Sequence, residues 1–311
     1  MSEPYRQGHL EVGDGHQMYF ECHGNPDGYP AVYFHGGPGG GFNRGIPEMF
    51  DLDRSQVVLF DQRGCGRSTP LAEAIDADLT TNTTRHLIAD TELLRERLEI
   101  HRWFVLGLSW GTTLGLAYTQ THPARVSATV LGLVTTTSRR EVEWITEGVG
   151  RIFPMEWERF VAAIPQHLAG LRPVDAYARW LFDPDPDECA TAALEWCTWE
   201  DAHVSLAPDA VPNLRYAEPD FRLRFARLVT HYWSNQAFLV DDQLIGGAGR
   251  LGGIPAVLLH GRYDVSGPLE TALRVHRAWP GSRLEIVEDA GHGGGGFDVA
   301  LRAAIAEMTT G

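Results

Sequence analysis

The chain has 311 residues, enough for one large domain with an insertion, and its 43% hydrophobic and 22% charged residues are typical of a globular protein. A formal net charge of -15 disfavours nucleic acids and anionic membranes as partners, because both require a basic face. The four cysteines are scattered without a Cys-x-x-Cys pair, the first 20 residues hold no apolar signal core, and no uncharged segment approaches a membrane span. These features predict a cytoplasmic protein.

The first 134 residues alternate between predicted strands and helices. An alternating pattern around an Asp-Gly pair predicts a hairpin, and continuous apolar runs predict strands that are buried on both faces of a sheet. Apolar residues at helical spacing follow a threonine-rich segment that is expected to cap the helix. The predicted elements are a hairpin at 10–22, strands at 31–34, 57–60, 103–108 and 126–134, and a helix over 83–100.

Residues 135–245 have a different character, with helical patterning and six of the nine tryptophans. This segment is predicted to form a helical cap inserted into a core made of residues 1–134 and 246–311. Strand and helix patterns then resume up to the C-terminus, with strands at 254–261 and 283–287 and helices near 268–279 and 297–309. The alternation predicts an α/β fold with a mostly parallel central sheet, which binds ligands at the carboxyl ends of its strands.

Ser109 lies in the sequence Gly107-Leu108-Ser109-Trp110-Gly111, where the strand 103–108 is expected to turn into a helix. Such a turn is the setting of a nucleophile elbow, because small glycines let the backbone adopt a strained conformation that exposes the serine hydroxyl. The five residues alone are a weak signal, since a Gly-rich turn can produce them by chance. Whether Ser109 is a nucleophile therefore depends on a base and an acid elsewhere in the chain.

Two later residues fit these roles. Asp264 follows the strand 254–261, and His292 follows the strand 283–287 in a glycine-rich loop, so both are expected at the same sheet edge as Ser109. In this interpretation Ser109 attacks an acyl carbon, His292 removes and returns the proton, and Asp264 orients the imidazole. Each residue alone could be an ordinary loop residue, but their order and strand context agree.

The segment HGGPGGG, residues 35–41, follows the predicted strand 31–34 and is expected to form the oxyanion hole. We assign one donor to the backbone amide of Gly37 and the other to that of Trp110. A phosphate-binding loop is the alternative, but the segment lacks the required lysine, and Pro38 has no amide hydrogen.

The segment DQRGCGRS, residues 61–68, could offer a second acid in Asp61, although we favour a role for Asp61, Arg63 and Arg67 in organising a turn beside the site. No His-Glu-x-x-His motif is present, and the early histidines fall on different predicted elements. We therefore expect no metal and no cofactor.

Five segments together resemble the proline iminopeptidase (prolyl aminopeptidase) family of serine peptidases, which has the α/β-hydrolase fold. They are HGGPGGG, DQRGCGRS, GLSWGTTLGLAY, HGRYD and AGH, spread over residues 35–292. The resemblance implies a triad of Ser109, Asp264 and His292. It also implies that the substrate is a small peptide or aminoacyl amide, from which an N-terminal residue, usually proline, is released through an acyl-enzyme.

The resemblance also implies that Glu200 in the cap binds the free amine of the substrate. Four positions depart from the family pattern. Val229 stands where a second glutamate is usual, and ungapped matching places Gly132 and Thr135 where an arginine and an aromatic residue face the proline ring. Ile145 stands where a tyrosine is common. These departures leave open an esterase or amidase that acts on a specialised metabolite. A binding protein without catalysis is a further alternative, although the intact triad argues against it.

Overall fold

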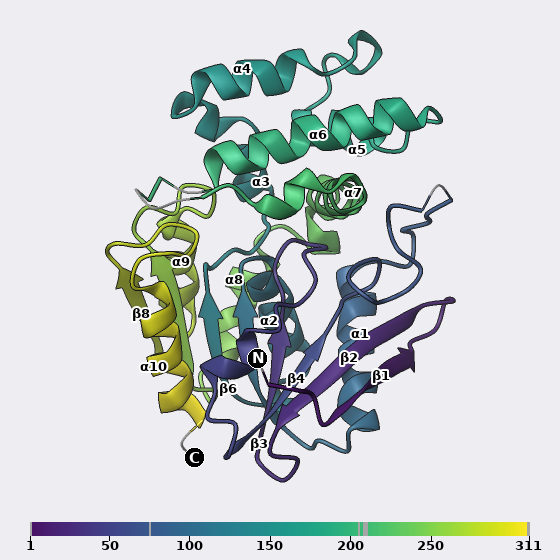
Figure 1. The fold of residues 1–311 in the computed structure, drawn as a ribbon. Coiled ribbons are helices and arrows are strands. Elements are labelled where there is room, and N and C mark those ends of the chain that lie inside the picture. Colours follow the sequence, from purple (N-terminus) through teal and green to yellow (C-terminus); the bar gives the residue numbers. More distant parts are fainter. Residues whose placement is uncertain (1, 75, 205, 208–210, 310–311) are drawn as a thin grey trace.

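The computed structural model describes residues 2–74, 76–204, 206–207 and 211–309, and eight strands within these ranges form a single sheet (Figure 1). The strand order is β1-β2-β4-β3-β5-β6-β7-β8, with β1, β2 and β4 paired antiparallel and the remaining neighbours parallel. The strands are β1 (Arg6–Glu11), β2 (Gln17–Gly24), β3 (Tyr29–Phe34), β4 (Ser55–Phe60), β5 (Trp103–Leu108), β6 (Val126–Gly132), β7 (Ala256–Gly261) and β8 (Ser282–Val287).

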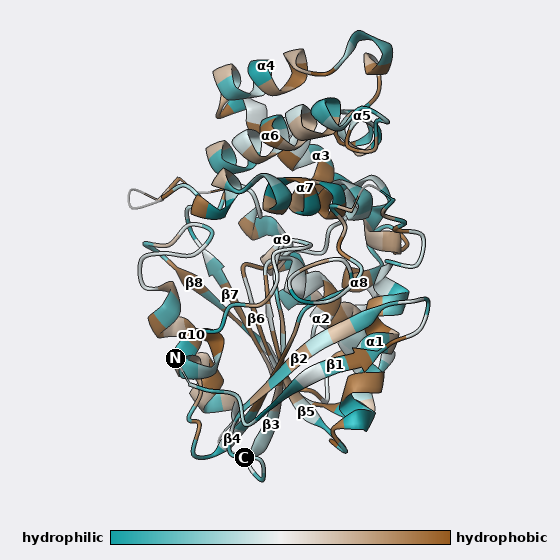
Figure 2. Ribbon diagram, turned by 45° about the vertical axis from the view of Figure 1, so that its right-hand side comes forward, coloured by the Kyte–Doolittle hydropathy of each residue, from teal (hydrophilic) through white to brown (hydrophobic). Residues whose placement is uncertain are grey.

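Helices cover both faces of the sheet, and hydrophobic residues run along its central strands (Figure 2). Successive side chains of a strand point to opposite faces, so β5 contributes to two cores. Its Phe104 and Leu106 share one hydrophobic cluster with Leu301 near the C-terminus, whereas Trp103 and Val105 belong to the cluster on the other face. The helices are α1 (Thr84–Arg97), α2 (Trp110–Thr121), α3 (Arg139–Thr146), α4 (Pro154–Ala162), α5 (Pro173–Trp180), α6 (Pro186–His203), α7 (Pro219–Ser234), α8 (Gln243–Gly247), α9 (Leu269–Ala278) and α10 (Phe297–Thr309).

The parallel strands end along one edge of the sheet. Their register pairs Leu108 with Gly132, Gly132 with Leu259, and Gly261 with Val287. The loops that follow β5, β7 and β8 therefore start side by side. This register brings together residues that are far apart in the sequence.

Helices α3 to α7 lie beyond this edge of the sheet, above the strands in Figure 1. Aromatic side chains hold them together. Phe160 of α4 stacks on Tyr177 of α5 and on Trp199 of α6, with ring centroids 4.5 and 5.2 Å apart. Such buried aromatic pairs contribute both apolar area and a preferred geometry, which fixes the position of α6 over the sheet.

The α/β fold with a mostly parallel sheet is confirmed, and each predicted strand and helix is present with small changes at its ends. The predicted strand 126–134 ends earlier, at Gly132. A threonine of the expected segment, Thr83, is the N-cap residue of α1, but its side chain makes no capping bond and instead pairs with His86 Nδ1 at 2.8 Å. In the part of the chain that the structure describes, no helix combines the length and apolar character needed to cross a membrane.

Candidate active site

Ser109 lies at the sharp turn between β5 and α2, with φ of 56° and ψ of -125°. A non-glycine residue in such a region costs about 1–3 kcal/mol and needs a rigid surrounding. Both flanking glycines are required by space: a Cβ on Gly107 would lie 2.4 Å from the carbonyl oxygen of Gly111, and one on Gly111 would lie 2.0 Å from that of Phe34. The turn therefore presents the serine side chain at the sheet edge, as the pattern predicts.

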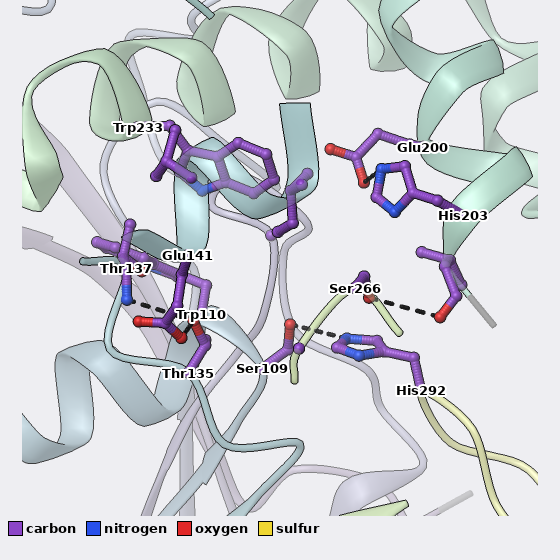
Figure 3. A pocket seen from close by; sticks show the side chains of 15 residues that line it. Ser109, Trp110, Thr135, Thr137, Glu141, Glu200, His203, Trp233, Ser266 and His292 are labelled. Atoms are coloured by element: carbon purple, nitrogen blue, oxygen red, sulfur yellow. Dashed lines mark hydrogen bonds and ion pairs between the residues drawn. The ribbon is translucent and has the colours of Figure 1, made fainter. Parts of the chain in front are cut away.

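Ser109, His292 and Asp264 form a continuous chain of hydrogen bonds. His292 Nε2 is 2.9 Å from Ser109 Oγ, and His292 Nδ1 is 2.8 Å from Asp264 Oδ2. The other Asp264 oxygen accepts a bond of 2.9 Å from the N–H of Gly267 and one of 3.2 Å from the Ser266 hydroxyl. The carboxylate is thus fixed in orientation, and it can hold the imidazole with its Nε2 toward the serine. Figure 3 shows the contact between His292 and the Ser109 hydroxyl.

The charges of this pair stabilise each other. Burial would lower the pKa of His292, but the charge of Asp264, their hydrogen bond and the charge of Glu200 together raise it above its ordinary value. Burial would likewise raise the pKa of Asp264, yet His292 keeps it below the ordinary value. A protonated imidazole is therefore stabilised at this position, as needed by a base that must accept a proton.

The glycine-rich loop 35–41 passes directly over Ser109. A Cβ on Gly36 would lie 3.3 Å from the Cβ of Ser109 and 3.8 Å from its Oγ. Gly37 has φ of 121°, which favours glycine, and both Gly37 and Trp110 line the same pocket as Ser109. Trp110 is the first residue of α2, so its N–H has no acceptor one turn earlier in the helix.

The segment 61–68 forms a tightly bonded turn beside the pocket. The buried carboxylate of Asp61 accepts bonds of 2.9 Å from the N–H groups of Phe42 and Arg67. Arg63 is also buried and donates two bonds, of 2.6 and 2.8 Å, to Asp90. These contacts use both Asp61 oxygens for structure, which supports the turn-organising interpretation over a second catalytic acid. Among the residues that the structure describes, no group of three or more His, Cys, Asp or Glu is placed to hold a metal ion.

A pocket of about 540 Å³, its opening to solvent included, extends from Ser109 toward the cap. The walls come from the sheet edge, from the loop after β6 and from helices α3, α6 and α7. They consist of Gly37, Ser109, Trp110, Thr135, Thr137, Glu141, Val142, Ile145, Glu200, His203, Val204, Trp233, Ser266, Gly267 and His292.

Two of the four positions that depart from the family pattern line this pocket. Thr135 and Ile145 do so, as predicted. Gly132 does not: it ends β6, and a Cβ there would lie 2.8 Å from the ring of Phe297, so its predicted position beside the substrate is wrong. Val229 is also outside the pocket lining and is fully buried in the core on α7.

Glu200 lies in the pocket wall on the last turn of α6. Burial raises its pKa to about 7, while the nearby His292 acts in the opposite direction. Figure 3 shows its carboxylate beside the ring of His203, above Ser109 and His292. The position fits the predicted amine-binding residue, because a buried carboxylate gains most from a cationic partner.

Comparison with known proteins places the chain in a family. A family model described as alpha/beta hydrolase fold matches residues 29–296. A Streptomyces coelicolor protein named as a probable proline iminopeptidase is 48% identical over 97% of this chain and 94% of its own length. A proline iminopeptidase of Xylella fastidiosa is 45% identical over 93% of this chain and 91% of its own length. The chain belongs to the proline iminopeptidase family.

A crystal structure of proline iminopeptidase from Mycobacterium smegmatis superposes with a TM-score of 0.66 and 20% identity, covering 98% of this chain and 99% of that chain. At this identity the likeness shows the fold alone. Membership of the proline iminopeptidase family makes this chain a hydrolase of the peptidase class. The relatives do not favour the alternative of an esterase with a remodelled pocket.

Two charged or polar residues of the pocket are not among the site residues predicted from the sequence. Glu141 on α3 accepts bonds from the Thr135 hydroxyl at 2.8 Å and from the Ser138 hydroxyl at 2.9 Å, and it also bonds Thr136. The Ser-x-x-Glu spacing at 138–141 is a capping-box signal that could have marked Glu141. The other is His203, three residues after Glu200 and so on the same helix face, which helical spacing could have revealed.

Proposed function

We propose that this protein is a serine peptidase that releases an N-terminal residue, above all proline, from short peptides or aminoacyl amides. Ser109, His292 and Asp264 act as its catalytic triad. The proposal rests mainly on one observation: the Ser109–His292–Asp264 hydrogen-bond chain opens into a pocket whose cap side carries the buried carboxylate of Glu200. The names of the relatives support the same substrate class.

In the first half of the reaction, the Ser109 oxygen attacks the carbonyl carbon of the first peptide bond while His292 Nε2 takes the hydroxyl proton. The carbonyl oxygen becomes an oxyanion and accepts hydrogen bonds from the amides of Gly37 and Trp110. One such donor can contribute about 3 kcal/mol to transition-state stabilisation. The C–N bond then breaks, His292 gives its proton to the leaving nitrogen, and an ester between Ser109 and the N-terminal residue remains.

In the second half, a water molecule replaces the leaving peptide. His292 takes a proton from this water, whose oxygen attacks the ester carbon, and the same two amides stabilise the new oxyanion. Collapse returns the proton from His292 to Ser109 and frees the amino acid. Asp264 keeps the imidazole in one tautomer and stabilises its positive charge throughout both halves.

In this proposal Glu200 makes the enzyme select substrates with a free N-terminal amine. An ammonium group at the cap side of the pocket pairs with the carboxylate, and the first carbonyl carbon is then held at Ser109. A peptide that lacks a free N-terminus at this point would leave Glu200 buried without a counter-charge, which is costly.

The division into a core of residues 1–134 and 246–311 and a helical cap of residues 135–245 is part of the same proposal. It is supported by the position of α3 to α7 beyond the sheet edge and by the pocket walls that both parts share (Figure 1). A cytoplasmic location stays a prediction from the sequence.

The proposal is tested by comparing prolyl and N-acetylprolyl arylamides with the purified enzyme. We expect wild-type kcat/KM to favour the free amine by about 100-fold or more, since a charged hydrogen bond is lost with the acetyl group. Glu200→Gln should lose most of this preference, mainly through a higher KM for the prolyl substrate. Glu195→Gln, on the same helix but paired at the surface with Arg159, is the matched control and should keep it. Failure of the wild type to hydrolyse any free-amine substrate would overturn the proposal.

The pH dependence of kcat/KM gives a second prediction. Glu200, with a pKa of about 7, must be ionised to attract an ammonium, and His292, with a raised pKa, must be neutral to act as a base. Activity on prolyl arylamide should therefore fall as the pH drops below about 7, with a logarithmic slope that approaches two. In Glu200→Gln only the His292 proton remains, and the slope should approach one. Equal slopes in the two enzymes would contradict the role of Glu200.

A further inference from the structure

The strongest unexplained feature of the pocket is a pair of buried polar side chains, Glu200 and His203, on one face of α6. His203 Nε2 is 3.9 Å from Glu200 Oε2, which is too long for a hydrogen bond. Within the described part of the chain, neither His203 ring nitrogen has a hydrogen-bond partner. Glu200 Oε1 has none within ordinary hydrogen-bond geometry, although the nearby Trp196 side chain acts to lower the pKa of Glu200. Most buried polar groups are bonded, so this pair calls for a ligand between or beside its members.

The surroundings of His203 keep it neutral and fixed. Burial lowers its pKa to about 3. A neutral imidazole has one nitrogen that accepts a hydrogen bond and one that donates. The ring also packs against Trp199, with centroids 4.9 Å apart, which limits its movement. His203 therefore cannot neutralise the Glu200 carboxylate as a cation, but it can place a second acceptor beside it.

We propose that His203 accepts one N–H of the substrate's N-terminal ammonium while Glu200 accepts the other, so that the pair recognises a secondary ammonium. This inference rests on the proposed function and assigns a further specificity residue to it. A protonated N-terminal proline carries two N–H groups on one nitrogen. A nitrogen that lies about 2.9 Å from each acceptor can bridge the 3.9 Å between Glu200 Oε2 and His203 Nε2.

Figure 3 supports this arrangement, because both side chains lie on the cap side of the pocket, across from the Ser109 hydroxyl and His292. Glu141, the other carboxylate in the pocket wall, is not a competing amine site. Its oxygens already accept bonds from the threonine and serine groups of residues 135–138. Among the described residues that line the pocket, the buried polar side-chain atoms without a hydrogen-bond partner are Glu200 Oε1 and the two ring nitrogens of His203.

The test compares prolyl arylamide with N-methylprolyl arylamide, which keeps the positive charge but has a single N–H. Removing the acceptor in His203→Leu should lower kcat/KM for the prolyl substrate by about 10- to 100-fold, mainly through KM, because a hydrogen bond to a charged group is lost. The N-methylprolyl substrate should change by less than about twofold, since it makes only one such bond. His203→Asn retains an acceptor and should restore part of the preference for prolyl over N-methylprolyl.

His231→Leu is the matched control, because His231 is a cap histidine bonded to the carbonyl of Asn82 and lies outside the pocket lining. The ratio of kcat/KM for the prolyl substrate to that for the N-methylprolyl substrate should be the same in His231→Leu as in the wild type. Equal losses on both substrates in His203→Leu would show a merely structural role and overturn the inference. If the wild type hydrolyses no prolyl substrate, the proposed function itself fails, so the two failures are distinguishable.

A binding measurement decides the matter even if His203→Leu does not fold. Calorimetry on the Ser109→Ala variant should show pyrrolidinium, with two N–H groups, binding at least about tenfold more tightly than N-methylpyrrolidinium, with one. Equal affinities of the two cations would overturn the role of His203 as the second acceptor.

Discussion

Ser109→Ala is expected to lower kcat for prolyl arylamide about a millionfold, the scale seen when the nucleophile of a serine protease is removed. The reason is local: without the hydroxyl, no acyl-enzyme can form, and His292 Nε2 loses the group that it contacts at 2.9 Å. Alanine is smaller than serine and fits the strained turn with no new contact. Circular dichroism and thermal unfolding should therefore match those of the wild type.

Ser282→Ala serves as the control for Ser109→Ala. Ser282 begins β8 and bonds His276 away from the pocket, so its loss should leave kcat unchanged. A fluorophosphonate probe should label the wild type and the control but not Ser109→Ala. Residual turnover near the wild-type rate, or labelling of the variant, would show that Ser109 is not the nucleophile.

Asp264→Asn should lower kcat about 10⁴-fold with little change in KM, as expected when the acid that orients a catalytic histidine is lost. The amide keeps the shape of the carboxylate but not its charge, so it no longer stabilises protonated His292. One of its atoms must also face the N–H of Gly267, which now donates to Asp264 Oδ1. The new side chain can satisfy that donor only by turning its own NH2 group toward His292 Nδ1, which favours the wrong tautomer.

The pH profile separates this effect from a folding defect. Because Asp264 raises the pKa of His292, the acid limb that belongs to His292 should move to lower pH in Asp264→Asn. Asp242→Asn, which removes a surface carboxylate paired with Arg274, should leave both kcat and the limb unchanged. An unshifted limb in Asp264→Asn would mean that the carboxylate does not set the charge of His292.

Much of the fold and the position of the three central side chains could be predicted because they depend on local patterns. Ser109, Asp264 and His292 each follow a strand with a clear apolar run, and parallel strands end at a common edge, so their order along the chain indicates their meeting point. The requirement for glycine at position 107 is equally local, because it arises from atoms within the turn, whereas the one at position 111 depends on the carbonyl of Phe34 on the neighbouring strand β3.

The cap side of the site depends on contacts that no local pattern contains. The placement of Glu200 follows from aromatic packing among α4, α5 and α6, which helical periodicity alone does not specify. Ungapped matching predicts Gly132 at the substrate, whereas the strand register places it between β5 and β7. His203 could be assigned to the face of Glu200 from its spacing, but its missing hydrogen-bond partners appear only in three dimensions.

The burial of Glu200 and His203, which both lie on α6, has a consequence for which polypeptides the enzyme can cleave. The N-terminus of a substrate must enter the pocket before its amine can reach these two side chains. An N-terminal residue that is packed into a folded domain cannot enter in this way. We therefore expect the enzyme to cleave short peptides and flexible N-termini. Folded proteins that begin with the same residue should not be cleaved. The burial of Glu200 and His203 would thus select substrates by the flexibility of their N-terminus, without any contact between the enzyme and the rest of the substrate.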